Sequence, residues 1–123
     1  MLESALTRRV QARLKDYGVF AFKVAGGARQ RAGISDLIGV LPDGKFLAIE
    51  LKRPGKYWLP WDGCTELQKK FLQTVAKNGG RGFACDSVED LERWLGAWGY
   101  EPVVDKPAAN VEELDLIPAS YLD

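Results

Sequence analysis

The sequence predicts an α/β fold in which a mixed sheet carries helices on both faces, and three observations support this prediction. Apolar residues recur every three or four positions in three segments, which is typical of amphipathic helices. Four shorter segments with alternating or continuous apolar residues predict strands. Along the chain the order is helix, three strands, helix, strand and helix. The expected helices are residues 2–17, 65–78 and 87–98, and the expected strands are residues 19–24, 34–41, 45–52 and 83–85.

The first helix and the first strand are indicated by their periodicity. One stripe of the helix collects its apolar side chains, which are Leu2, Leu6, Val10, Leu14 and Tyr17. We expect Gly18 to end the helix, because glycine readily adopts the left-handed conformation of a helix C-cap. In the strand that follows, Phe20 and Phe22 share one side of the sheet, and Lys23 faces the other side.

The second and third strands form a hairpin closed by Pro42-Asp43-Gly44. If the loop has three residues and Gly44 is left-handed, the register places Asp36 opposite Glu50 on the same face. A loop of two residues would place the two acids on opposite faces, because side chains alternate with a period of two. The register of this hairpin therefore decides whether the acids meet.

The second helix begins at a capping box, Thr65-x-x-Gln68, and ends before Gly79-Gly80. A short apolar strand, Phe83 to Cys85, comes next, and Ser87 is the expected N-cap of the last helix. The acidic segment after Gly99 looks like an appendage to the domain. We therefore expect one domain over residues 1–100 and an acidic tail over residues 101–123.

The composition bounds the function. The chain has 123 residues, 46% of them apolar, which is enough for one domain. No apolar run reaches the roughly 18 residues of a membrane-spanning helix, and residues 1–4 lack the layout of a signal peptide, so we expect a soluble cytoplasmic protein with no membrane partner. The absence of histidine excludes serine–histidine catalysis and histidine-ligated zinc. Cys64 and Cys85 are isolated, and we expect free thiols.

The net charge of zero hides an asymmetry. Residues 1–56 hold eleven basic and five acidic side chains, whereas residues 101–123 hold one basic and six acidic side chains. A basic region is the electrostatic signature of a protein that binds a polyanion such as DNA, and a solvated basic surface is the alternative. A further hypothesis is that the tail lies over the basic region and restrains non-specific DNA binding.

The hairpin acids suggest a metal-dependent chemistry. Two carboxylates facing each other across a ladder destabilise a sheet unless a positive charge lies between them. Lys52 follows Glu50 by two residues and so shares its face. Oxygen ligands that leave room for water suit Mg²⁺ or Mn²⁺, and a neighbouring lysine can hold a water or neutralise a phosphate. This combination favours phosphodiester hydrolysis, and a purely structural acid pair remains the alternative.

A known family carries the same ordered motifs. The segments Gly33-Ile34-Ser35-Asp36-Leu37-Ile38-Gly39, Ala48-Ile49-Glu50-Leu51-Lys52, Thr65-x-x-Gln68 and Gly79-Gly80 resemble those of the VRR-NUC (virus-type replication-repair nuclease) family of the PD-(D/E)XK nuclease superfamily. The resemblance implies a restriction-endonuclease-like αβββαβα core with a mixed central sheet flanked by helices. It also implies metal-dependent DNA cleavage and, by similarity to Holliday-junction resolvases, a homodimer.

The resemblance also implies roles for individual residues. Asp36 and Glu50 would ligate the metal together with the carbonyl of Leu51, and Glu3 would complete the carboxylate set. Lys52 would be the catalytic lysine, and Gln68 the helix glutamine of the active site. For Glu3 the alternative is a favourable charge in the first turn of a helix. For Gln68 the alternative is the capping box, and we expect the two roles to be compatible only if its side chain is free when substrate binds.

Basic residues around the catalytic strand are the expected DNA contacts, namely Lys23, Arg29, Arg31, Arg53 and Lys56. For Lys23, a side chain that points into solvent is the alternative. The glycine-rich loop between residues 25 and 33 lacks the Lys-Ser/Thr ending of a P-loop, so no nucleotide cofactor is expected.

The sequence thus predicts a Mg²⁺- or Mn²⁺-dependent endodeoxyribonuclease that selects branched or Holliday-junction DNA in a bacterial or phage-infected cell. Two alternatives stay open. One is a DNA-binding or assembly module that has the fold without catalysis. The other is a flap or duplex nuclease of a defence system.

Overall fold

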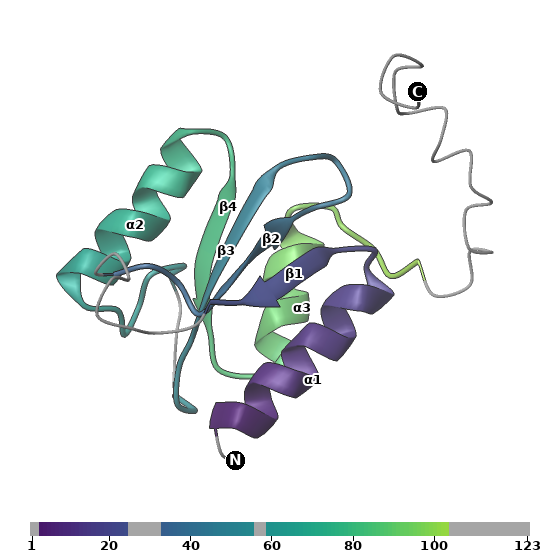
Figure 1. Ribbon diagram of the computed structural model, residues 1–123, viewed down its shortest axis with the longest axis horizontal. Helices are drawn as coiled ribbons and strands as arrows, with labels where there is room; N and C mark the ends of the chain where they lie inside the picture. Colours follow the sequence, from purple (N-terminus) through teal and green to yellow (C-terminus); the bar gives the residue numbers. More distant parts are fainter. Residues whose placement is uncertain (1–2, 25–32, 56–58, 104–123) are drawn as a thin grey trace, which may run out of the picture.

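The computed structural model describes residues 3–24, 33–55 and 59–103, and these contain three helices and four strands. The order along the chain is helix, three strands, helix, strand and helix, as predicted (Figure 1). The elements are α1 (Glu3–Asp16), β1 (Phe20–Lys23), β2 (Leu37–Val40), β3 (Phe46–Leu51), α2 (Glu66–Lys77), β4 (Arg81–Cys85) and α3 (Val88–Ala97).

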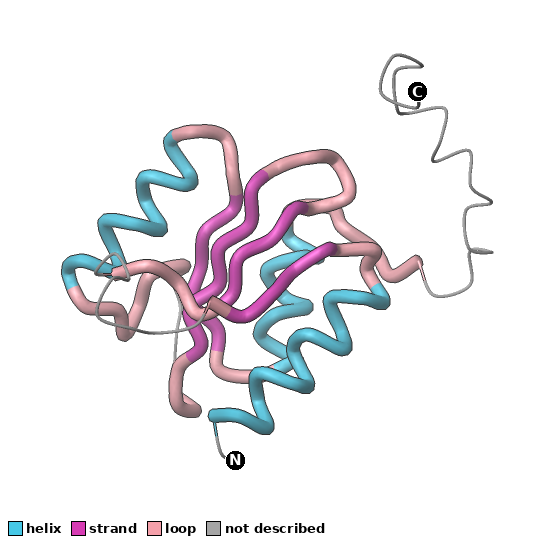
Figure 2. Tube along the Cα trace, in the orientation of Figure 1, coloured by secondary structure: helices cyan, strands magenta, loops and turns pink. Residues whose placement is uncertain are grey.

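The four strands form one mixed sheet in the order β1-β2-β3-β4 (Figure 2). The β1–β2 and β2–β3 pairs are antiparallel, and the β3–β4 pair is parallel. A parallel pair needs a long crossover, which α2 provides between β3 and β4. The predicted mixed sheet is therefore confirmed. The strand expected from residue 34 begins only at Leu37. The backbone N–H of Leu51 on the neighbouring strand donates to the side-chain carboxylate of Asp36 instead of continuing the backbone ladder.

Helices α1 and α3 cover one face of the sheet, and they bury the main core with it (Figure 1). The helices contribute apolar residues at the predicted spacings, and the strands contribute every second residue. The fully buried or nearly fully buried members include Val10, Leu14, Leu37, Leu47, Ile49, Phe83, Leu91 and Leu95. We call this side of the sheet the closed face.

Helix α2 packs on the opposite face, and among the described strands its main contacts are with β3 and β4. Under it, Ala48, Leu72 and Val75 form a second, smaller core. The part of this face that α2 leaves uncovered carries Phe20, Phe22, Val40 and Phe46, each more than 40% exposed. The pairings of β1 with β2 and of β2 with β3 put these four side chains on the same side of the sheet as Ala48. We call these four residues the open face.

The hairpin between β2 and β3 has the predicted register. Leu37 pairs with Ile49, and the loop is closed by a hydrogen bond from the Leu41 N–H to the Lys45 carbonyl, with a donor–acceptor distance of 2.9 Å. Gly44 has a φ of 87°, the left-handed conformation that a three-residue loop of this type requires. Continued by one residue, the ladder places Asp36 opposite Glu50. The two acids therefore share the face that carries α2.

Several expectations concern parts of the chain outside the described residues. Arg29, Arg31, Lys56, the side chain of Glu3 and residues 104–123 of the acidic tail belong to this group. In the portion of the chain that is described, no helix combines the length and the apolarity needed to cross a lipid bilayer.

Candidate active site

Asp36 lies where β2 and β3 part. Its carboxylate Oδ2 accepts a hydrogen bond of 2.8 Å from the backbone N–H of Leu51. Its carbonyl oxygen accepts a hydrogen bond of 2.9 Å from the N–H of Val24. Asp36 is therefore held by both neighbouring strands, and its side chain satisfies a backbone donor that the shortened ladder leaves available.

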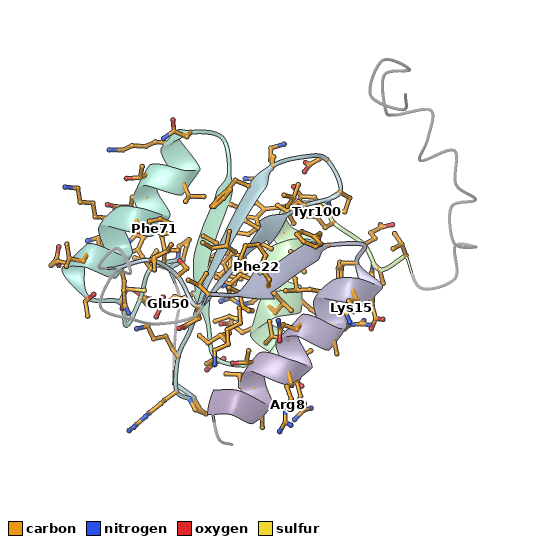
Figure 3. All side chains as sticks on the ribbon, in the orientation of Figure 1. Arg8, Lys15, Phe22, Glu50, Phe71 and Tyr100 are labelled. Carbon is orange, nitrogen blue, oxygen red and sulfur yellow. The ribbon has the colours of Figure 1, made fainter. Side chains whose placement is uncertain are left out.

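Glu50 is the most buried acid of the candidate site, with a side chain only 6% exposed. It lies on the α2 side of the sheet (Figure 3). Its Oε1 accepts a hydrogen bond of 2.9 Å from Nε2 of Gln68, and Nζ of Lys52 lies 3.8 Å from the same oxygen. Burying a carboxylate is costly unless it is paired and hydrogen-bonded, and these two neighbours compensate much of that cost.

Gln68 connects the active-site strand to the start of α2. Its Oε1 accepts a hydrogen bond of 2.8 Å from Nζ of Lys52 and another of 2.9 Å from the N–H of Thr65. The hydroxyl of Thr65 accepts a hydrogen bond of 3.2 Å from the N–H of Gln68, which completes the predicted capping box. The expectation for the substrate-bound state stays a prediction, but without substrate the capping and site contacts already coexist. One amide makes both sets of contacts at once, because its carbonyl oxygen has two lone pairs and its NH₂ group is left to donate.

Gly33 brings the segment that carries Asp36 against the first turn of α2. Its φ is 82°, and a Cβ atom placed on it would lie 2.6 Å from the carbonyl oxygen of Leu67. Only glycine allows both this backbone conformation and this approach. The motif glycine therefore sets how closely the helix that carries Gln68 approaches the acids.

The structure thus brings together four of the predicted site residues, namely Asp36, Glu50, Lys52 and Gln68. The predicted ligand Leu51 lies between Glu50 and Lys52 and is buried. Lys23 is not brought to this group. It pairs with Leu37, a closed-face residue, so its exposed side chain starts from the side of the sheet opposite to the two acids.

A cavity of about 680 Å³ adjoins the site at the end of β3. Its lining combines basic, acidic and apolar residues from α1, the end of β3 and the start of α3. They are Leu6, Arg9, Leu51, Lys52, Arg53, Pro54, Asp86, Ser87, Val88 and Glu89. The predicted DNA contact Arg53 is exposed and lines this cavity. The sequence analysis did not propose Arg9 as a functional residue. Its position off the apolar stripe of the first helix was the feature that could have indicated an exposed basic side chain.

The two cysteines are free thiols, as expected. Cys64 lies close enough to the site for the charges of Lys52 and Glu50 to act on its thiol. Burial raises the pKa of the Cys64 thiol above its usual value, and the Lys52 ammonium acts in the opposite direction. Burial also raises the pKa of Cys85, which is completely buried. Both groups are therefore neutral thiols near pH 7, and neither supplies a thiolate.

The donor set of the site consists of oxygen atoms. Within the ranges that the structure describes, no group of three or more acidic, cysteine or histidine side chains is positioned to hold a metal ion. The oxygen donors that the sequence offers here are the carboxylates of Asp36 and Glu50 and the carbonyl of Leu51, which are hard ligands. Such a set fits a cation like Mg²⁺, which keeps several water ligands and binds through one or two carboxylates.

Comparisons with known proteins relate the chain to one family of domains. The family profile of the VRR-NUC domain matches residues 4–89. A solved structure described as a VRR_NUC domain is similar with a TM-score of 0.60 at 20% sequence identity, and the match covers 80% of this chain and 97% of that chain. No curated protein matches significantly. At 20% identity the solved structure supports the fold alone, whereas the family profile spans most of the chain. The chain therefore belongs to the VRR-NUC family of nuclease domains.

Proposed function

We propose that this chain is a metal-dependent endodeoxyribonuclease whose catalytic residues are Asp36, Glu50, Lys52 and Gln68. The observation that carries the proposal is the hydrogen-bonded set of Glu50, Gln68 and Lys52 on the face where the hairpin register also places Asp36. A structural acid pair would not require a partly buried lysine and a helix amide beside it. Residues of these types at one strand end match what phosphodiester hydrolysis needs.

Each residue has a distinct part in the proposed reaction. Asp36, Glu50 and the carbonyl of Leu51 would hold Mg²⁺ or Mn²⁺, and Glu3 would add a further carboxylate. The cation would supply Lewis acidity toward the phosphate oxygens. Lys52 would donate from Nζ to the attacking water or to a phosphate oxygen, where negative charge increases during the reaction. Gln68 would hold Lys52 and Glu50 in their relative positions, since its amide bonds to both.

For the substrate, we propose branched DNA of the Holliday-junction type, which a homodimer would cut. The basic composition of residues 1–56 supports a polyanionic partner. Each chain offers one site, and symmetric cutting of a four-way junction needs two sites related by a two-fold axis. Arg53, with Arg29, Arg31 and Lys56, would contact the phosphates. Lys23 would bind DNA only if the substrate also reached the edge beside β1.

The test is cleavage of four-way, three-way, flap, linear and plasmid DNA with Mg²⁺ or Mn²⁺. We expect nicks in branched DNA that need the cation, and a loss of at least about 100-fold in rate for Asp36→Asn and for Lys52→Met, since removal of a group that stabilises charge or transfers protons typically costs 10²–10⁴. Lys77→Met, on an exposed lysine in the last turn of α2, is the matched control and should cut normally.

The same assay separates the two alternatives. A binding or assembly module would shift the mobility of the DNA and leave it intact with every cation. A duplex or flap nuclease would cut those substrates faster than the four-way junction. Either result would contradict the corresponding part of the proposal, and product mapping would give the position of the cut.

A further inference from the structure

The open face places exposed aromatic rings directly beside the candidate site. Phe20 and Phe22 are 69% and 49% exposed, and their ring centroids lie 6.1 Å apart. Both residues point to the same side of the sheet as the acids, since Phe22 pairs with Ile38, and Ile38 pairs with Ala48 beneath α2. Figure 3 shows Phe22 on β1, across the sheet from α2.

The distance along the sheet from these rings to the site is short. The Val24 N–H is bonded to the Asp36 carbonyl, so β1 and β2 still adjoin at the first acid. Phe22 lies two residues before Val24 and on its face, which puts the ring one row of side chains away from Asp36. In an antiparallel pair such diagonal neighbours are about 7–8 Å apart, which is about the spacing of neighbouring nucleotides in an extended strand. A strand cut at Asp36 and Glu50 would therefore place its next nucleotide at Phe22.

The chemistry of the open face indicates what kind of nucleotide it takes. Its two rings nearest the candidate site, Phe20 and Phe22 on β1, are exposed on the surface of the sheet. Aromatic rings bind nucleobases by stacking, largely regardless of base identity. In the interior of a duplex every base is already stacked between its neighbours, so its faces are closed to a protein ring. Only an unpaired nucleotide can use this surface.

We propose that Phe22, assisted by Phe20, stacks on an unpaired nucleotide next to the scissile phosphodiester, so that the enzyme selects DNA with a single-stranded segment at the cut. This inference rests on the proposed nuclease function and deepens it, because it assigns the preference for branched DNA to particular side chains. Continuity with the candidate site favours a DNA strand over another protein as the occupant of the open face.

The experiment measures DNA binding without catalysis, so that its outcome is independent of the cleavage assay. Forked DNA with 2-aminopurine in the unpaired arm beside the branch, and a blunt duplex of the same length, are titrated with the full chain in Ca²⁺. We expect Phe22→Ala to weaken binding to the fork by about 5- to 100-fold, the range typical of one lost base-stacking contact, and to change duplex binding less than twofold. Quenching of 2-aminopurine should disappear in the same variant.

Two further variants separate stacking from general loss of apolar surface. Phe22→Tyr should restore binding and quenching, because it keeps the ring. Phe46→Ala removes a similarly exposed ring, 43% exposed, at the hairpin end of the open face, where the ladder pairs Phe46 with Val40, and it should bind the fork like the parent chain. Equal weakening of fork and duplex by Phe22→Ala, or unchanged fork binding, would overturn the proposal.

The other conceivable occupants give different results in the same variants. If a second copy of the chain covered the open face, Phe22→Ala would convert a dimer into monomers in light scattering. If another part of the same chain covered it, such as residues 104–123, Phe22→Ala would lower the urea midpoint as much as a core substitution does. Either result would overturn the proposal even if Asp36→Asn abolished cleavage.

Discussion

The two faces of the sheet use the same strands for different purposes. On the closed face, Leu37, Leu47 and Ile49 are completely buried beneath α1 and α3. On the other face, the intervening residues of β2 and β3 run from the exposed Val40 and Phe46 to the polar group around Glu50. The comparison shows that one alternating sequence supplies the core through one set of side chains and the candidate site through the other.

The energetics of the faces differ accordingly. Each fully buried aliphatic or aromatic side chain of the closed face contributes about 1.5–3 kcal/mol through the removal of apolar surface from water. The face under α2 buries little apolar surface, and it also carries a carboxylate whose burial is costly. Stability therefore resides mainly in the closed face, which leaves the opposite face available for binding and chemistry.

The largest expected effect on stability concerns β2, because this strand has Leu37 on the closed face and Val40 on the open face. Leu37→Ala should lower the free energy of unfolding by about 2–5 kcal/mol, because it opens a cavity in a close-packed core. Val40→Ala, on the open face, should change it by less than about 0.5 kcal/mol. Urea denaturation followed by circular dichroism measures both. Similar losses for the two variants would show that the open face is covered in solution.

A smaller effect is expected where Gly33 approaches α2. Gly33→Ala should cost about 1–3 kcal/mol for the left-handed backbone, and the contact with the Leu67 carbonyl should displace the helix and reduce cleavage. Gly99→Ala is the matched control, because Gly99 has a φ of 87° but nothing within 4 Å of an added Cβ. It should lose the backbone contribution alone and cut DNA normally. Equal cleavage by the two variants would contradict the proposed role of this close approach.

The two helix caps provide the next comparison. Thr65→Ala and Ser87→Ala each remove a hydroxyl that accepts a hydrogen bond from the backbone at a helix start, and each should cost about 0.5–2 kcal/mol. Only Thr65 shares its bonding partner, Gln68, with Lys52 and Glu50. We therefore expect Thr65→Ala to reduce the cleavage rate severalfold at saturating Mg²⁺, whereas Ser87→Ala leaves it unchanged. A parallel loss of rate in both variants would assign the effect to general destabilisation.

The smallest effect is expected at the rim of the closed face, where Glu92 of α3 bonds to Arg13 and Tyr17. The bond from Arg13 holds the pKa of Glu92 below its usual value. A depressed carboxyl pKa stabilises the fold above the unfolded pKa, about 4.3, and this contribution is lost as the pH falls through the lower folded value. The urea midpoint should therefore fall less steeply between pH 5 and pH 2 in Glu92→Gln than in the parent chain. Glu89→Gln, an exposed acid of the same helix, should keep the parent slope.

Much of the secondary structure could be predicted because its signals are local. The caps at Thr65 and Ser87 and the hairpin loop at Gly44 depend on residues within a few positions of each other, and the structure contains all three. The strand ends were less predictable. The alternation of residues 34–41 continues past Leu37, but the Asp36 carboxylate takes the backbone bond there, and periodicity carries no information about such competition.

The candidate site was predictable to the extent that it follows from the hairpin. Asp36, Glu50 and Lys52 are related by one register, so a turn type and a period of two suffice to bring them together. Lys23 could not be assigned in this way. Its face depends on how β1 pairs with β2 across the connection at residues 25–32, and the loop sequence does not specify that pairing. Arg9 likewise joins the site region only through the packing of α1.

By itself, the sequence determined the order of helices and strands and the placement of Asp36 opposite Glu50 on one face of the sheet. These features depend on helix caps, turn geometry and side-chain alternation, which act over short distances in the chain. Only the tertiary structure decided that one amide of Gln68 bonds to Lys52 and Glu50 while it caps α2, and that α2 packs mainly on β3 and β4. These features depend on where a helix rests on a sheet. That position is set by close contacts such as the one between Gly33 and Leu67, whose partners are far apart in the chain.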